Sequence, residues 1–176
     1  MVDRITVEQV RAWLDTQVVS GVEEISGSET EFNLQLEVSR LPIHVIKERP
    51  DGPVRIVGKS GFDTDRVAAL LDSERQRHEL LTRIGPVLLA VPGFYSFLDE
   101  EGERCSFENV HTIQIEHRLY PDALSQHQLM TSVIAIAKGM RYIQNTVTIV
   151  RESVSGAVDG ENGAFEERDG GDGTEE

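Results

Sequence analysis

The feature that most constrains the fold of this chain is an apolar stripe in its second half. Apolar residues recur there at alternating steps of four and three, at Leu129, Val133, Ile136, Met140, Ile143, Val147 and Val150. This spacing places them on one face of an α-helix, and a capping box at Ser125 and Gln128 marks the start of that helix. A coiled coil has the same spacing, but the flanking positions carry no charged ladder. We therefore predict a long helix from Ser125 to Val150 that lies across a sheet.

The segment before this helix has the pattern of a half-buried strand. Between residues 110 and 120, Ile113, Ile115 and Leu119 fall on one face. The other face is polar and consists of Thr112, Gln114, Glu116 and Arg118. Side chains of a strand alternate between its two faces, so one face should be buried and the other open. Pro121 cannot donate to a strand ladder and should end the strand.

The first residues predict a helix followed by strands. A capping box at Thr6 and Gln9 begins the helix, and Gly21 is expected to stop it. A short strand is expected at residues 22–25. Residues 32–38 alternate between apolar and polar side chains, which is typical of a strand.

Two further apolar runs should form a hairpin. They cover residues 43–46 and 54–57 and flank the turn sequence Pro50-Asp51-Gly52. Proline presets a negative φ and glycine accepts a positive one, so we expect Gly52 to adopt a positive φ.

The middle of the chain predicts two helices and one more strand. Asp63 or Thr64 is expected to cap the first helix, and Ser73 to begin the second. The pair Gly85-Pro86 should kink or end the second helix. The run from Phe94 to Leu98 is expected to be a strand.

Together these elements predict an α+β fold. An antiparallel sheet should be packed by an N-terminal helix, the middle helices and the long C-terminal helix. Residues 1–154 are expected to form a single domain. Residues 155–176 contain eight acids, one base and several glycines, and such a segment cannot bury enough apolar surface to offset its ordering entropy. We predict that this tail is disordered.

The charge of the chain limits the classes of partner that it can bind and indicates the kind of cell that it comes from. The net charge is −14, and only Lys47, Lys59 and Lys138 are lysines. Many carboxylates with few lysines are typical of proteins that stay hydrated in concentrated salt, which points to a halophilic source; an acidic mesophile protein is the alternative. An acidic surface disfavours nucleic acid as a partner.

Further composition features bear on location. Cys105 is the single cysteine and cannot form an internal disulfide. The most apolar run, residues 84–98, is too short and too interrupted to span a membrane. We see no secretory signal and expect a cytoplasmic protein that does not bind membranes.

Several motifs of known chemistry are incomplete. Gly58-Lys59-Ser60 resembles the end of a phosphate-binding loop but lacks the glycine five residues earlier, and we interpret it as a turn at a strand end. His78-Glu79 is not followed by a second histidine at the zinc-motif spacing. His111 and His117 stand about 20 Å apart along a strand, too far to share one ion. We therefore predict no catalytic residues, no cofactor and no metal.

Two weaker candidate sites remain. Arg118, Tyr120 and Asp122 lie on one strand face or at its exit and could form a polar site, although Asp122 could equally assist the start of the helix. A candidate interaction surface combines apolar residues that one small sheet does not obviously need, and it consists of Met130, Ile134, Ala137, Val87, Leu88 and Val91.

The chain also resembles a family of uncharacterised archaeal proteins. The resemblance rests on Val10-Arg11-Ala12-Trp13-Leu14, the strand around Phe32, Ile43-His44-Val45-Ile46, the paired helices near Asp65 to Leu81, and Glu116-His117-Arg118-Leu119-Tyr120-Pro121-Asp122-Ala123-Leu124. The family has a type III secretion chaperone-like fold, which it shares with a family described as a sensory-transduction regulator. The resemblance implies a compact α+β module that can dimerise and bind protein segments, and it transfers no catalytic residue.

Two hypotheses about function follow. The first is a non-catalytic protein-binding or chaperone-like module that acts through apolar surface and can form a homodimer. The alternative is a small-molecule-binding protein or an enzyme with its site at the corner formed by Arg118, Tyr120 and Asp122.

Overall fold

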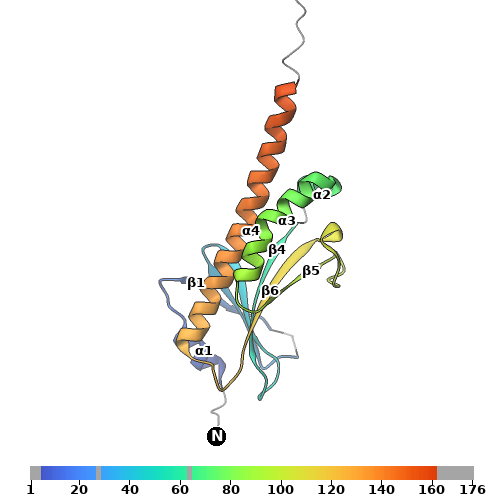
Figure 1. The fold of residues 1–176 in the computed structure, drawn as a ribbon. Coiled ribbons are helices and arrows are strands. Elements are labelled where there is room, and N and C mark those ends of the chain that lie inside the picture. The colour runs from blue at the N-terminus through green and yellow to red at the C-terminus, as the bar shows by residue number, and fades with distance from the viewer. Residues whose placement is uncertain (1–4, 27–28, 63–64, 162–176) are drawn as a thin grey trace, which may run out of the picture.

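A single antiparallel sheet forms the centre of the molecule (Figure 1). The computed structural model describes residues 5–26, 29–62 and 65–161, and within these ranges six strands follow one another in the order β1-β2-β3-β4-β6-β5. The strands are β1 (Val19–Glu24), β2 (Phe32–Val38), β3 (Leu41–Lys47), β4 (Val54–Gly61), β5 (Phe94–Leu98) and β6 (Thr112–Leu119). All neighbouring pairs are antiparallel, which confirms the predicted α+β class.

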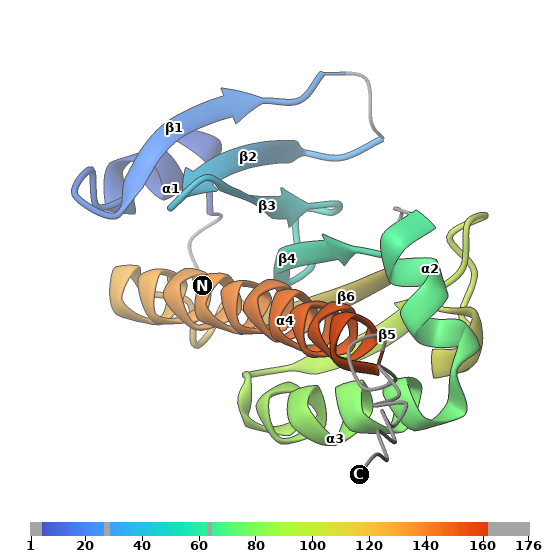
Figure 2. The ribbon, with the colours of Figure 1, turned by 90° about the horizontal axis from the view of Figure 1, so that it is seen from above.

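The helices of the described residues lie on one face of this sheet (Figure 2). They are α1 (Val7–Trp13), α2 (Asp65–Asp72), α3 (Glu74–Ala90) and α4 (Gln126–Glu161), together with the short 3₁₀ helix η1 (Phe107–Asn109). Helix α4 runs across β3, β4 and β6, and α3 packs beside it. The opposite face of the sheet is therefore left to its own polar side chains.

The predicted stripe of α4 is the centre of the core. Six of its seven residues are at most 1% exposed, and Val147 packs against the core from its margin. Ile113, Ile115 and Leu119 of β6 are buried, and β6 contacts α4. These contacts confirm that the stripe packs on a sheet.

Two glycines allow α4 to lie close to its neighbours. A Cβ atom added at Gly58 in β4 would lie 2.3 Å from Met140 Sδ and 2.6 Å from Ile136 Cγ2. A Cβ atom added at Gly139 in α4 would lie 2.7 Å from Val91 Cγ1 and 3.3 Å from Ile115 Cδ1. Because a side chain at either position would crowd these neighbours, the two glycines let the helix lie close to the sheet and to Val91.

Helix α4 starts as predicted and ends later than predicted. The Ser125 hydroxyl accepts a hydrogen bond from the Gln128 backbone N–H at 3.2 Å, as expected for the cap. The helix continues past Val150 to Glu161, so residues 155–161, expected as the start of the tail, are helical. Residues 162–176 lie outside the described residues, and their disorder stays a prediction. None of the described helices combines the length and apolar character needed to cross a bilayer.

Helix α1 is shorter than predicted. It is capped by Thr6 as expected, but it ends at Trp13 and not at Gly21. Leu14 is extended, and the Asp15 carboxylate then accepts the Gln17 N–H at 2.8 Å, which stabilises a turn in place of further helix. Gly21 lies inside β1, where the register with β2 shifts, so this glycine marks a bulge.

Helix α3 was expected to kink or end at Gly85-Pro86, and the prediction of an end was wrong. The helix starts at the Ser73 cap and continues through Pro86 to Ala90. A side chain before proline clashes with the proline ring in a helix, but Gly85 has no Cβ and removes that part of the clash. The predicted cap of α2 at Asp63 or Thr64 lies outside the described residues.

The predicted hairpin of β3 and β4 is confirmed, but its turn is of another kind than expected. Gly52 donates its N–H to Arg49 O at 3.0 Å and stands last in the turn, where no positive φ is needed. Positive φ values occur instead at Ser39 and Arg40 in the turn between β2 and β3. Gly58-Lys59-Ser60 lies within β4 and is not a strand-end turn.

We expect Gly58→Ala to lower the free energy of unfolding by about 1–3 kcal/mol, because the added methyl group overpacks the contact with α4. Urea unfolding followed by circular dichroism measures the change. The matched control is Gly21→Ala, whose Cβ would meet Glu37 Cβ at an ordinary 3.6 Å. This control should stay within about 0.5 kcal/mol of wild type. Equal effects in the two variants would contradict the close seating of α4.

Candidate functional site

The three residues of the predicted polar corner do not form one site. Arg118 lies on the open face of β6, and Tyr120 and Asp122 are exposed in the turn that follows. In the described part of the chain, no hydrogen bond or ion pair links Arg118 to Tyr120 or Asp122. The partners of Arg118 are Glu116, at 2.8 Å from Nε, and the Phe94 ring, whose centroid lies 5.3 Å from the guanidinium carbon.

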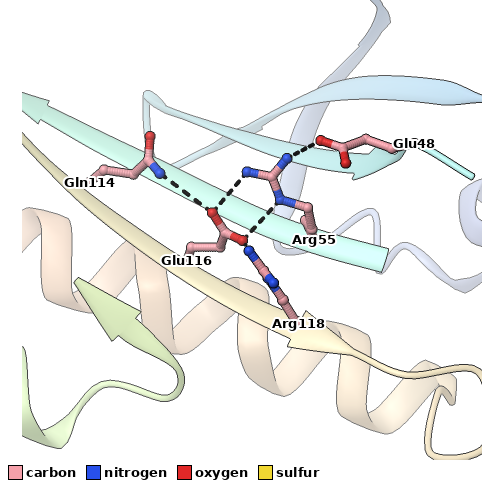
Figure 3. Close-up of polar contacts among 5 residues, drawn as sticks. All are labelled: Glu48, Arg55, Gln114, Glu116 and Arg118. Carbon is pink, nitrogen blue, oxygen red and sulfur yellow. Dashed lines mark hydrogen bonds and ion pairs between the residues drawn. The ribbon is translucent and has the colours of Figure 1, made fainter. Parts of the chain in front are cut away.

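A buried carboxylate organises the open face of the sheet instead (Figure 3). Glu116 of β6 is only 2% exposed. It accepts hydrogen bonds from Nε and Nη2 of Arg55 on β4, at 2.9 and 2.8 Å, and from Nε of Arg118. Gln114 Nε2 adds a longer bond of 3.4 Å, and Glu48 pairs with the free end of Arg55. Figure 3 shows these side chains on the side of β4 and β6 that faces away from the helices.

The surroundings of Glu116 keep it ionised. Burial is the largest influence on the pKa of Glu116 and raises it, but the hydrogen bonds and charges of Arg55 and Arg118 together outweigh burial. The pKa of Glu116 therefore lies below its ordinary value. The hydrogen bond to Glu116 raises the pKa of Arg55 in turn. The network holds β4 and β6 together by a charged contact on the face that none of the described helices covers.

A small hollow of about 190 Å³ lies beside this network. Its lining consists of Glu48, Arg49, Gly52, Pro53, Arg55 and Arg118. The lining has no hydroxyl, thiol or amine nucleophile, and its one carboxylate, Glu48, is paired with Arg55. The Arg55 guanidinium is also paired with Glu116. The arrangement fits a structural brace better than a reaction site.

A second polar pair connects the sheet to α4. Ser132 is buried and donates its hydroxyl proton to Gln128 O at 2.8 Å, so it must accept from His117 Nδ1 at 2.9 Å. The His117 proton is therefore on Nδ1. Burial lowers the pKa of His117, which favours the neutral ring. Since Ser132 is closed off from solvent, this pair is a packing contact.

A further hollow, of about 950 Å³, lies between the start of α3 and η1. Its lining is mixed in charge and includes Arg77, His78 and Glu108. Arg77 is already occupied, because it donates to Leu71 O at 2.7 Å and pairs with Glu108 at 3.5 Å. Glu74, Arg75 and His78 of the same lining are exposed.

The described ranges contain neither a metal-binding cluster nor an activated thiol. No three His, Cys, Asp or Glu side chains gather there closely enough to hold a metal ion. Burial raises the pKa of the Cys105 thiol, and the charge of Asp99 raises it further, so the thiol stays protonated near neutral pH.

The residues of the predicted interaction surface fall into two places. On α4, Ile134 is 38% exposed, while Ala137 and Met130 are more covered. Val87 of α3 and Val91, which caps the end of that helix, are half-buried. Leu88 is 3% exposed and belongs to the core. The neighbouring Leu89 points outward and is 79% exposed. Ile134 and Ala137 line a groove to which neither Met130 nor the three residues near α3 contribute.

This groove lies between α4 and the turn that joins β2 to β3, and its volume is about 450 Å³. It is lined by Val18, Val38, Ser39, Leu41, Ile134, Ala137, Lys138, Arg141, Tyr142 and Asn145. Tyr142 is 45% exposed in spite of its size. The side chain of Arg141 donates to Ser39 O and so ties the helix to the turn. We call this region the α4 groove.

The turn between β2 and β3, which forms one wall of the α4 groove, has a strained backbone. Ser39 and Arg40 have φ values of 51° and 66°, which L-residues with side chains rarely adopt. A two-residue hairpin turn of this type usually carries asparagine or glycine. Backbone strain of this kind often accompanies functional sites.

Comparisons with known proteins give a family and a fold. The sequence matches the family described as "Uncharacterized conserved protein (DUF2299)" over residues 6–147. The fold is similar to that of an uncharacterized protein from Methanothermobacter thermautotrophicus, with a TM-score of 0.65 and 13% sequence identity, covering 82% of this chain and 97% of that one. At this identity the likeness concerns the fold alone. No curated protein is significantly similar to the chain.

We expect Glu116→Gln to lower the free energy of unfolding by about 1–3 kcal/mol near neutral pH, because the two arginines lose their charged acceptor. The folded pKa of Glu116 lies below its ordinary value of 4.5, so its contribution is present above that value and is lost as pH falls through the folded pKa. The stabilities of variant and wild type should therefore converge in acid. Urea unfolding at a series of pH values measures this.

The matched control for this prediction is Glu48→Gln, which removes the other carboxylate beside Arg55. Glu48 is exposed, and its loss should cost at most about 1 kcal/mol. A loss for Glu116→Gln no larger than for Glu48→Gln, or one that does not shrink in acid, would contradict the brace.

Proposed function

The chain belongs to the DUF2299 family of uncharacterized conserved proteins, and we propose that it is a non-catalytic protein-binding module. The observation that carries this proposal is the α4 groove. Two large side chains, Ile134 and Tyr142, stay exposed there beside an apolar floor of Val18, Val38 and Leu41. Contiguous exposed apolar surface with a polar rim is typical of sites that bind protein segments.

The shape of the α4 groove supports an extended or helical peptide as its ligand. Ile134, Lys138, Tyr142, Asn145 and Ile149 follow one another along one side of α4. Ile149 is also exposed, so the apolar face continues past the groove. A ligand that lies along α4 would cover all of these positions.

The resemblance noted in the sequence supports two finer parts of the proposal. We propose that the fold is type III secretion chaperone-like and that the module handles segments of other proteins, with homodimerisation as part of its action. We also propose a cytoplasmic location in a halophilic archaeon, which the net charge of −14 and the three lysines support.

The alternative, a small-molecule or catalytic site at the corner of Arg118, Tyr120 and Asp122, has less support. Arg118 is paired with Glu116, and Tyr120 and Asp122 point into solvent without a shared contact. Catalytic groups need convergence on one reacting position, which this corner does not offer.

We expect peptides selected from a displayed library against the wild-type protein to carry large apolar residues and to bind the α4 groove. Their affinity for Ile134→Asp should fall at least about tenfold, since the variant buries a carboxylate against apolar groups. Fluorescence anisotropy with labelled peptides measures this.

The matched control is Leu89→Asp, which places the same charge on an exposed apolar residue of α3 outside the groove. This variant should bind the peptides as wild type does, and thermal melting should show both variants folded. Loss of binding in Leu89→Asp but not in Ile134→Asp would move the site away from α4.

The halophile proposal has its own test. Repulsion among carboxylates should destabilise the chain in dilute buffer, and salt should screen it. We expect the helical circular-dichroism signal and the melting temperature to rise as potassium chloride is increased into the molar range. A fully folded protein in dilute buffer, with a melting temperature that salt does not change, would favour an acidic mesophile protein.

A further inference from the structure

The charge of the α4 groove is opposite to that of the chain as a whole. The chain has 31 acidic and 17 basic residues. The lining of the groove contains no acid and two bases, Lys138 and Arg141. Lys138 is exposed on α4 and makes no ion pair in the described part of the chain. The groove therefore suits a ligand that combines an apolar anchor with negative charge.

The chain itself contains a segment of that kind. Residues 162–176, which lie outside the described residues, include six acids and one base. Phe165 is the single large apolar side chain among them, and Glu166 and Glu167 follow it directly. An aromatic residue flanked by acids matches an apolar groove flanked by Lys138 and Arg141.

We propose that the α4 groove of one copy binds the acidic segment around Phe165 of a second copy. The inference rests on the proposed function, because both use the same groove. The Phe165 ring would occupy the apolar space beside Ile134 and Tyr142, and the acids that follow would lie near Lys138.

The length of α4 determines that the groove of one copy binds the segment of a second copy and not its own. Glu161 is twenty residues beyond Arg141, which corresponds to about 30 Å along a helix. Figure 1 shows the end of α4 projecting well beyond the sheet. Phe165 follows Glu161 by four residues, and these span at most about 14 Å. The segment therefore does not reach back to the groove of its own copy.

In a twofold-symmetric dimer, the groove of each copy is filled by the segment of the other. If two α4 helices run antiparallel with Phe165 of one copy beside Arg141 of the other, the axis passes near Ser153, midway between the two. Each copy then offers one segment and one groove, so the same contact forms twice. The exposed side chain of Ile149, on the groove side of α4, lies four residues from this axis, or about 6 Å along the helix, where α4 of the second copy can cover it.

The test uses full-length protein and two single variants. Wild type should form a dimer of twice 19.6 kDa in sedimentation equilibrium. Phe165→Ser disables the segment and Ile134→Asp disables the groove, and each variant alone should dimerise at least tenfold more weakly. A mixture of the two should form mixed pairs, because one intact segment still meets one intact groove. This pairing between two defective proteins is not expected of any other interface.

A synthetic peptide of residues 162–176 provides the second measurement. It should bind full-length Phe165→Ser and dissociate wild-type dimers, and the same peptide with Phe165→Ser should not. Lys138→Glu should weaken peptide binding severalfold at low salt, and the difference should close as salt screens the charges.

Three results would overturn the inference. The first is a wild-type mass that Phe165→Ser leaves unchanged, and the second is a mixture that forms no mixed pairs. The third is peptide binding that Ile134→Asp does not affect. If the tail peptide fails while library-selected peptides still bind the groove, this inference falls and the proposed function stands. If neither kind of peptide binds, both fall.

Discussion

The seat of α4 on the sheet depends on the room left by two glycines, Gly58 in β4 and Gly139 in the helix. Sliding α4 by one turn would bring Ala135 or Ile143 to the place of Gly139, against Val91 and Ile115. The helix is therefore held in one register, and its apolar stripe stays over β3, β4 and β6. The position of every other surface on α4, including the groove, follows from this register.

The two faces of the sheet bury their side chains in different ways. The face toward α4 excludes water with aliphatic side chains, whereas the open face buries Glu116 by pairing it with Arg55 and Arg118. Among the described residues, every buried side-chain nitrogen and oxygen atom has a hydrogen-bond partner. The flank of α4 beside the turn between β2 and β3 still exposes Ile134 and Tyr142, which is why the groove, and not the charged network, carries the functional proposal.

Periodicity predicted the stripe of α4 and the buried face of β6, because burying one face of an element imposes its period on the sequence. It could not predict contacts between distant strands. Glu116 was placed on a polar face, and Arg55, which makes its burial tolerable, lies 61 residues earlier. For the same reason, the sequence predicted only part of the α4 groove. Ile134 and Ala137 flank the stripe on their own helix, but Val18, Val38 and Leu41 reach the groove only through the fold. Glycine was a poor predictor of helix ends at two positions. Gly85 precedes a proline within a helix that continues, and Gly21 lies in a strand bulge.

The bulge at Gly21 also affects how copies of this molecule meet. Strand β1 is one edge of the sheet, and the unpaired N–H and C=O groups of an edge strand invite a further strand from another molecule. The register shift between Val19 and Gly21 twists this edge and interrupts the regular row of donors and acceptors. Strand addition, which leads to open-ended stacking of sheets, is thereby disfavoured at β1. On this side of the sheet, association is left to side-chain surfaces, which can close on themselves and stop at a defined number of copies.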